Sequence, residues 1–475
     1  MSFDDLRSFI GRLEEEGELL RVGQEVDWNE EAGAIVRRSS ELGLPAVLFD
    51  KVKDYPGRRL AGGLMSSVRR VAIAMGMPAD TPPRKLMAEF LSRTQDPVSP
   101  VLVETGPCKE NILLGDDVDL WALPAPLVHA GDGGRYLCTW HVNVTKDPDN
   151  DWVNWGMYRA MVHEKNKLGI LVQQNQHIFQ IFRKYEARQR PMEIAIAIGV
   201  EPMSTLCACT FFPPFVSEAG MVGAMRGKPV ELVRCETVDL EVPATAEIVI
   251  EGTMRPGVRR EEGPFGEYTG YRASDRAPRP VVEVSAVTHR HNPIVTMSCE
   301  GVPVTETHAN MSITKSAQVE RELRARGFPI TGVWIFPESC NQLGVVATKV
   351  PYANVAAVIA HTVWSTPAAY ALPFLIVVED DVDPYSWSQV MHALATRCHP
   401  YRGIRRSEFE ASNPLDPRLP IEERRLGMGS KVYFDCTWPA NWDREDVPQL
   451  ISFNTAYSKE IQERVLRNWS NYGFR

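Results

Sequence analysis

Apolar residues near the N-terminus recur with the spacing of one helical face. They lie three or four positions apart, at Phe3, Leu6, Phe9, Ile10 and Leu13. This periodicity predicts a helix over residues 2–20, with Ser2 as its N-cap. We also expect a helix at 29–42, a short strand at 45–49, and helical structure over 66–95 that is broken at its prolines. Residues 1–115 are therefore predicted to form an α/β N-terminal region.

Between about residues 120 and 298 the pattern changes to short apolar runs that turns of Gly, Pro and Asp separate. Runs of this length and spacing are typical of strands. We expect a mostly antiparallel barrel or sheet, interrupted by helices at 177–187 and 217–225. The predicted strands are residues 138–145, 157–163, 168–172, 193–198, 230–234, 247–251 and 281–288.

Helices and strands alternate in the last third of the chain. A long helix is predicted over 306–327, where Gly and Pro end it. Strands at 332–336, 344–348 and 374–378 then alternate with helices at 353–364 and 386–396. The tail from Pro439, rich in Trp, Asn and charge, is expected to pack on another surface or subunit. The predicted division is an N-terminal region (1–115), a central domain (116–305), a linker helix (306–330) and an α/β C-terminal domain (331–475).

Composition narrows the protein class without identifying a function. The chain has 475 residues, 44% hydrophobic and 24% charged, with a net charge of -9. An acidic chain without a Lys/Arg run is not expected to bind nucleic acid. No apolar run approaches about 18 residues, and the N-terminus resembles no targeting peptide, so we expect a cytoplasmic protein without a membrane span. Nine scattered cysteines without a CxxC motif indicate reduced thiols rather than disulfides or a zinc site.

The segment from Glu262 to Glu267 is the first candidate for chemistry. Two carboxylates stand five positions apart, and two glycines, a proline and Phe265 lie between them. Gly and Pro break regular structure, so this is predicted to be a turn that can direct both acids toward one pocket. Two neighbouring carboxylates raise the pKa of one of them, which can then donate a proton. On spacing alone, a surface turn with two solvated acids is the more common explanation of such a segment.

A second candidate is the set formed by Asn154, His177 and Glu218, all at predicted element starts. An amide oxygen, an imidazole nitrogen and a carboxylate, completed by phosphate oxygens, suit octahedral Mn²⁺ or Mg²⁺ better than zinc. Helix starts also favour phosphate. Each residue has an ordinary alternative as a turn residue, a surface histidine or a first-turn acid.

The order and spacing of these motifs resemble the UbiD-like decarboxylases, which use prenylated FMN. The resemblance covers most of the chain and is strongest from Trp140 to His308. It rests on several separated segments, and their combination is far more specific than any one of them. These are Asn154-x₄-Arg159, Gln176-His177, Glu218, Glu262-Gly-Pro-Phe-Gly-Glu267, Glu306-Thr307-His308 and Val378-Glu-Asp-Asp-Val-Asp-Pro384.

The resemblance implies a fold, a cofactor source and an assembly. The central domain would be a flavin-reductase-like split β-barrel that binds prenylated FMN. The α/β C-terminal domain would form a homo-oligomer, either a dimer or a hexamer. A UbiX-like flavin prenyltransferase would supply the cofactor.

The resemblance also implies roles for individual residues. Arg159, Glu262 and Glu267 would form the catalytic network, with Glu267 as proton donor. We expect Arg159 to pair mainly with Glu262.

The resemblance also implies which residues contact the cofactor. Asn154, His177 and Glu218 would hold Mn²⁺ (or Mg²⁺) bound to the flavin phosphate. Glu218 would share a K⁺ with backbone carbonyls around two further residues, Cys209 and Thr210. The flavin site would also include Trp155, Met157, Arg159 and Gln176.

The implied reaction is a reversible, non-oxidative decarboxylation through a covalent adduct with prenylated FMN. We favour an aromatic or heteroaromatic acid of the phenolic, pyrrole, furan or indole type. Phe211 and Phe212 would wall a flat ring, and His308 is either a substrate contact or a packed or surface histidine. The alternatives are a cinnamic-type acid as substrate, or a reductase or binding module that uses plain FMN. A nicotinamide oxidoreductase and an inactive scaffold fit less well, because GxGxxG is absent and the acids are intact.

Overall fold

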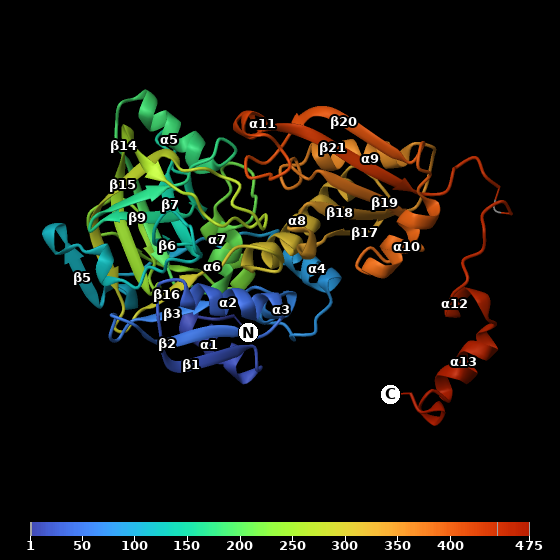
Figure 1. Ribbon diagram of the computed structural model, residues 1–475, viewed down its shortest axis with the longest axis horizontal. Coiled ribbons are helices and arrows are strands. Elements are labelled where there is room, and N and C mark those ends of the chain that lie inside the picture. The colour runs from blue at the N-terminus through green and yellow to red at the C-terminus, as the bar shows by residue number, and fades with distance from the viewer. Residues whose placement is uncertain (1, 444, 475) are drawn as a thin grey trace.

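The computed structural model describes residues 2–443 and 445–474. Figure 1 shows an N-terminal part in blue, a central sheet in green and yellow, and a C-terminal part in orange. Helices and strands mix throughout, so the α/β (α+β) class predicted from the sequence is confirmed. Within these residues no helix has both the length and the apolar character needed to cross a bilayer.

The N-terminal part follows the predicted pattern in outline, but its first helix is shorter than the predicted 2–20, and β3 was not predicted. Asp5 caps this helix instead of Ser2, because its carboxylate accepts a hydrogen bond from the backbone N–H of Ser8 at 2.8 Å. The apolar face is buried as predicted. The elements are α1 (Leu6–Glu15), β1 (Leu19–Val26), α2 (Glu31–Glu41), β2 (Ala46–Val52), β3 (Arg59–Gly62), α3 (Val68–Ala74) and α4 (Pro83–Arg93).

Strand β16 (Ile294–Met297) connects the central part to the N-terminal part. It pairs in parallel with β3 and completes a four-stranded sheet in the order β1-β2-β3-β16. A strand that follows the central sheet in sequence therefore belongs to the N-terminal sheet in space. The two parts share hydrogen bonds as well as side-chain packing.

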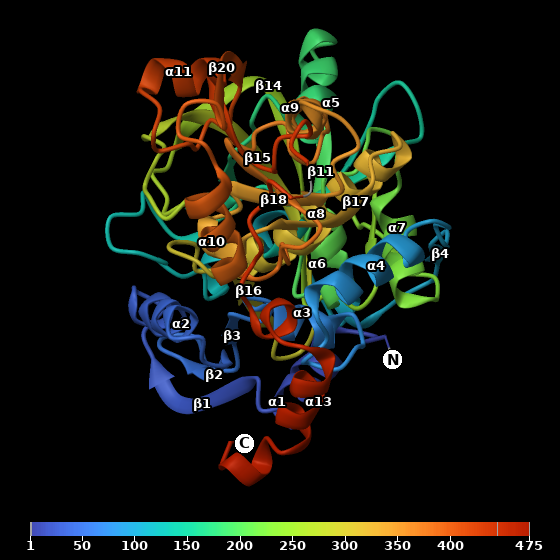
Figure 2. The same ribbon diagram turned by 90° about the vertical axis from the view of Figure 1, so that its right-hand side faces the viewer.

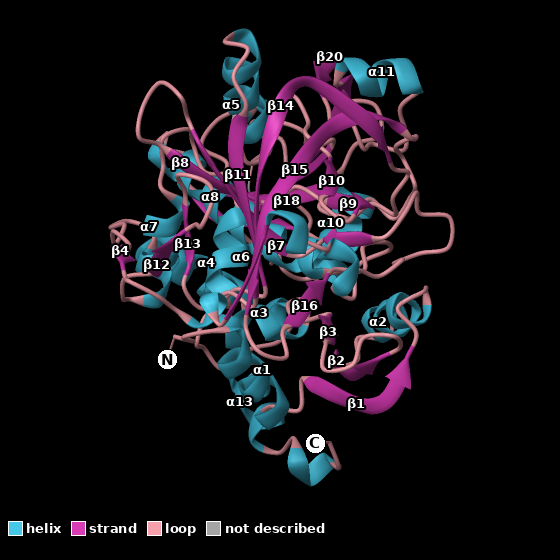
Figure 3. Cartoon of the chain, turned by 90° about the vertical axis from the view of Figure 1, so that its left-hand side faces the viewer, coloured by secondary structure: helices cyan, strands magenta, loops and turns pink. Residues whose placement is uncertain are grey.

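The central part is a curled antiparallel sheet in the order β6-β9-β10-β15-β14-β11-β7-β8, with β5 also pairing with β15. Its end strands do not pair, so the sheet forms a half-barrel that Figure 3 shows around the long β14 and β15. Strand β14 continues to Glu262, because it pairs with β15 beyond a register shift. The strands are β5 (Asn111–Leu114), β6 (Tyr136–Cys138), β7 (His141–Lys146), β8 (Val153–Gly156), β9 (Ala160–Glu164), β10 (Lys167–Ile170), β11 (Met192–Ile198), β14 (Ile248–Glu262) and β15 (Ala277–His289).

Helices and a small sheet complete the central part. The helices α5 (His177–Ala187) and α7 (Glu218–Arg226) lie where the sequence predicts them. The helix α6 (Pro202–Ala208) was not predicted, and the Glu201 carboxylate caps it by accepting from two backbone N–H groups. The small sheet contains β4 (Val101–Leu102), β12 (Glu231–Arg234) and β13 (Glu241–Pro243).

The helix α8 (Glu306–Ala325) runs from the central part into the C-terminal part (Figure 1). Beyond it lies a five-stranded sheet in the order β17-β18-β19-β21-β20. Its last two strands were not predicted from the sequence. The elements are β17 (Ile330–Ile335), β18 (Leu343–Thr348), α9 (Val355–Trp364), β19 (Phe374–Glu379), α10 (Trp387–Arg397), β20 (Ile404–Ala411), α11 (Ile421–Leu426) and β21 (Met428–Cys436).

The C-terminal tail extends away from the rest of the chain, as Figures 1 and 2 show. It contains α12 (Phe453–Ala456) and α13 (Lys459–Arg467). None of its described residues from 439 onward is buried. Several large apolar side chains are exposed there, among them Trp442, Ile451, Leu466 and Trp469.

Candidate active site

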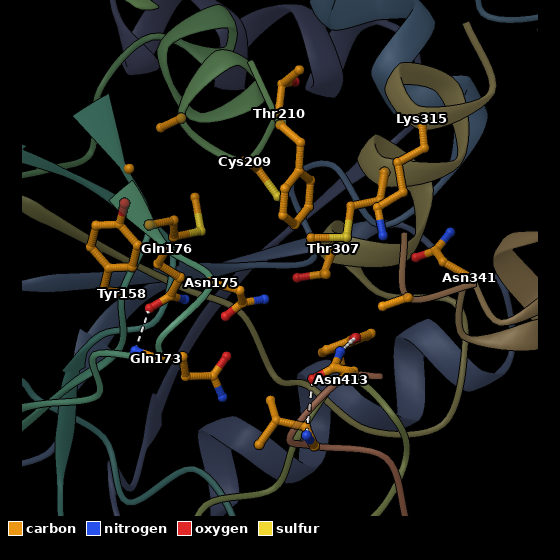
Figure 4. Close-up of a pocket in the computed structure, with 18 of the residues that line it drawn as sticks. Tyr158, Gln173, Asn175, Gln176, Cys209, Thr210, Thr307, Lys315, Asn341 and Asn413 are labelled. Atoms are coloured by element: carbon orange, nitrogen blue, oxygen red, sulfur yellow. Dashed lines mark hydrogen bonds between the residues drawn. The ribbon is translucent and has the colours of Figure 1, made fainter. Parts of the chain in front are cut away.

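A cavity of about 260 Å³ lies between the half-barrel and the C-terminal part. Figure 4 shows side chains that line it. The central part contributes the segment from Asn154 to Arg159 and the residues that follow α6. The opposite wall comes from α8 and from three C-terminal loops that carry Asn341, Tyr370 and Asn413. Residues distant in sequence therefore line one cavity.

The predicted network of two acids and one arginine is assembled at this cavity. The Arg159 guanidinium binds both carboxylate oxygens of Glu262, from Nε at 3.0 Å and from Nη2 at 3.1 Å. Its Nη1 forms an ion pair with Glu267. All three side chains are at most 8% exposed. Arg159 thus contacts both acids, with the two-pronged contact to Glu262, as expected from the sequence.

Tyr136, a residue without a sequence motif, also belongs to this network. Its hydroxyl donates to Glu262 Oε1 at 2.7 Å. Burial and the adjacent carboxylate raise the pKa of Tyr136, so the phenol keeps its proton. Glu262 therefore receives hydrogen bonds from both Arg159 and Tyr136, which fix the position of its carboxylate.

The turn that carries Glu267 is packed against a second loop. Gly263 has a φ of +84°, and a Cβ on Gly133 would lie 1.9 Å from the Gly263 carbonyl oxygen. The Gly133 N–H donates to the Pro264 carbonyl at 2.7 Å, and the Gly266 N–H donates to Asp132 at 3.0 Å. The glycines predicted to form the turn thus also permit this close approach.

His308, which the sequence leaves as either a substrate contact or a packed or surface histidine, lies outside the cavity. It is fully buried and does not line the cavity among the described residues. Its Nδ1 accepts from the Thr305 N–H at 2.9 Å, and its Nε2 donates to the Tyr268 carbonyl at 2.5 Å. Burial lowers the pKa of His308, which favours the neutral ring that these contacts require. His308 is the packed histidine of the two alternatives, and it ties α8 to the residue after Glu267.

The second predicted set also comes together at the cavity. Asn154 lies within β8, where it pairs with Thr145 of β7, while His177 and Glu218 begin α5 and α7. Asn154 Nδ2 lies 3.2 Å from Glu218 Oε1 and 3.5 Å from His177 Nδ1. The other Glu218 oxygen accepts from the backbone N–H of Trp155 at 3.0 Å. Three elements therefore bring an amide, an imidazole and a carboxylate into contact.

The charges of this set favour a bound cation. Burial raises the pKa of Glu218 to about 7 and lowers the pKa of His177. Within the described residues no Lys or Arg forms a salt bridge with Glu218, and Asn154 places an N–H donor between the two other groups. A hard divalent ion could take that position if the amide turned its oxygen inward. The described residues contain no cluster of three His, Cys, Asp or Glu side chains, so the amide would be essential.

The remaining predicted residues line the same cavity, except His308. They are Trp155, Met157, Gln176, Cys209, Thr210, Phe211 and Phe212. Phe212 also packs inward, where its ring lies 6.5 Å from that of Phe90. Four further residues of the cavity lie outside the recognised motifs, so no sequence signal pointed to them: Lys315, Asn341, Tyr370 and Asn413.

Models of one protein family match the sequence over most of its length. The 3-octaprenyl-4-hydroxybenzoate carboxy-lyase N-terminal domain matches residues 10–90, the Rift-related domain matches 101–303, and the C-terminal domain matches 308–436. The chain belongs to the UbiD family of carboxy-lyases. The sequence-based recognition is thereby confirmed.

Individual UbiD relatives cover nearly the whole chain. The pyrrole-2-carboxylic acid decarboxylase of Pseudomonas aeruginosa is 35% identical over 99% of this chain and 98% of its own. The closed form of the Sedimentibacter hydroxybenzoicus vanillic acid decarboxylase has a TM-score of 0.90 at 32% identity, with 99% of each chain covered. An evolved dimeric form of the UbiD-class enzyme HmfF from Pelotomaculum thermopropionicum, in complex with prFMN, has a TM-score of 0.80 at 32% identity, covering 94% of this chain and 97% of that one.

Proposed function

We propose that this chain catalyses the reversible, non-oxidative decarboxylation of an aromatic or heteroaromatic acid with prenylated FMN as cofactor. The observation that carries the proposal is the contact of Arg159 with both Glu262 and Glu267 at one cavity. A plain flavin reductase would not need this network. Membership of a carboxy-lyase family supports the same reaction.

The second set of residues fits the phosphate end of the cofactor. Asn154, His177 and Glu218 would hold Mn²⁺ or Mg²⁺, and that ion would bind the flavin phosphate. Carbonyls at the end of α6, around Cys209 and Thr210, would hold K⁺ because a helix C-terminus attracts cations. Bound prenylated FMN would supply the electron sink that loss of CO₂ requires.

The two acids and Arg159 would deliver the proton that takes the place of CO₂. Breaking the bond to the carboxylate releases CO₂ and leaves an electron pair on the ring carbon, which must gain one proton. Glu267 would donate that proton and regain one from solvent before the next turnover. Arg159 would orient Glu267, and the hydrogen bonds from Arg159 and Tyr136 would hold Glu262 in place.

A flat ring suits the cavity beside Phe211 and Phe212. Aromatic side chains stack on rings with centroids about 4.5–7 Å apart, which favours a planar substrate there. The similar proteins named for pyrrole-2-carboxylic and vanillic acid support an aromatic or heteroaromatic acid, and one named for ferulic acid supports the cinnamic-type alternative.

The first experiment tests the cofactor and the reaction together. The protein is co-produced with a UbiX-like flavin prenyltransferase and supplied with Mn²⁺ and K⁺. We expect an intact cofactor mass one prenyl unit above FMN, and CO₂ release from at least one aromatic or heteroaromatic acid. Plain FMN with no CO₂ release would favour the reductase or binding-module alternative. Release only from cinnamic-type acids would move the substrate class to acrylic acids.

We further propose that the exposed tail mediates a homo-oligomer. Removing residues 439–475 should lower the number of chains per particle in solution, because the apolar side chains exposed on α13 and its flanks would no longer be there to contact a second chain. Light scattering coupled to gel filtration measures the change. A truncation that removes only 470–475 and keeps α13 is the control. An unchanged mass, or a monomeric full-length chain, would contradict the proposal.

A further inference from the structure

Lys315 is a cation on the cavity side of α8. It follows Thr307 and Met311 at successive four-residue intervals, which places the three on one helical face, and all three line the cavity. Figure 4 shows the Lys315 side chain reaching down from α8 toward the space between Thr307 and Asn341. Its Nζ lies 5.1 Å from the ring of Phe211. Gln318, also on α8, donates to the Phe211 carbonyl at 2.9 Å and so holds the backbone of Phe211 in place.

No acidic side chain of the described residues forms a salt bridge with Lys315. Glu300 also lines the cavity, but its carboxylate oxygens accept hydrogen bonds from hydroxyl groups and not from Lys315. Ser298 and Thr307 donate to Oε1 at 2.8 and 2.5 Å, and Thr305 donates to Oε2 at 2.7 Å.

Lys315 itself carries a positive charge near neutral pH. Burial lowers the pKa of Lys315 to about 8, which leaves most of the amine protonated at neutral pH. Lys315 is half-buried at the cavity wall and forms no salt bridge among the described residues, so an anion that enters the cavity would gain a favourable charge pair with it.

We propose that Lys315 binds a second carboxylate on the substrate ring, so that the preferred substrates are aromatic or heteroaromatic dicarboxylic acids. This inference rests on the proposed decarboxylase function. The carboxylate that is lost would face Arg159 and Glu267, while the retained one would pair with Lys315. A neutral ring hydroxyl could accept a hydrogen bond from Lys315 but would not balance its charge, so charge complementarity favours the diacid.

The test compares ring acids that differ only in the second substituent. Dissociation constants for benzoate, 4-hydroxybenzoate, isophthalate and terephthalate are measured by calorimetric titration of holoenzyme carrying Glu267→Gln, so that no ligand is consumed. We expect at least one diacid to bind about 10- to 100-fold more tightly than benzoate, as charged hydrogen bonds allow. Lys315→Met and Lys315→Gln should remove this preference, and Lys315→Arg should keep it. Lys349→Met, at an exposed lysine, is the matched control.

Two results would overturn the subsite. One is benzoate or 4-hydroxybenzoate binding as tightly as both diacids. The other is an equal loss of affinity for benzoate and diacids in both neutral variants, which would indicate a role in folding alone. A preserved diacid preference without CO₂ release from any acid by the unsubstituted holoenzyme would leave the subsite intact and refute the decarboxylase function.

Discussion

Replacing Glu267 with glutamine is expected to abolish turnover while the cofactor stays bound. Glutamine has nearly the same shape, but its amide cannot deliver a proton as a carboxylic acid does. Arg159 keeps its two-pronged contact with Glu262, so its position should not change. Loss of a positioned general acid lowers rates by about 10²–10⁴-fold. CO₂ release measures the rate, and the flavin absorbance of the same sample measures cofactor retention.

The control for this variant is a nearby acid of the same type. Glu261 is exposed on β14 next to Glu262, so Glu261→Gln should retain full activity. Full turnover in Glu267→Gln would remove Glu267 as the proton donor. Loss of flavin absorbance together with activity would mean that Glu267 holds the cofactor instead.

Much of the site could be predicted because its residues lie at the ends of elements that local sequence determines. α5 begins at His177 and α7 begins at Glu218, close to where periodicity predicts helix starts. The turn after Glu262 follows from its glycines and proline. In each case a few consecutive residues determine the backbone conformation, and that conformation sets the direction of the side chain.

What could not be predicted depends on contacts between distant segments. The run of β14 to Glu262 requires its pairing with β15, which local propensity does not reveal. Tyr136 has no motif, and its contact with Glu262 joins residues 126 positions apart. His308 carries a family motif, yet its role follows from the Thr305 cap and the Tyr268 carbonyl. The cavity wall near Asn341 arises only when the C-terminal part packs against α8.

The two sets of site residues are linked by one short segment. Asn154 and Arg159 flank the end of β8, so the backbone that orients the proposed metal ligand also orients the arginine. Tyr158, between them, donates its hydroxyl to Asn154 Oδ1 at 3.2 Å. A shift of this segment would disturb both sets together. Cofactor loading and proton transfer are therefore expected to depend on the same few residues.

Replacing His177 with alanine is expected to lower both metal and flavin occupancy. Glu218 and Asn154 would remain, but the only imidazole of the set would be lost, and the phosphate would lose part of its counter-ion. Loss of an outer hydrogen-bond partner alone weakens metal binding about 10- to 100-fold, and we expect more for a direct ligand. Elemental analysis gives Mn²⁺ per chain, and absorbance gives flavin per chain.

The control replaces an exposed helical histidine outside the cavity. His392 lies on α10, so His392→Ala should leave both occupancies unchanged. If His177→Ala lost flavin but kept Mn²⁺, the ring would contact the cofactor without binding metal. Unchanged occupancy of both would exclude His177 from the ion set and would leave only Asn154 and Glu218. Because two protein ligands rarely retain a divalent ion without a chelating partner, that outcome would also question the metal itself.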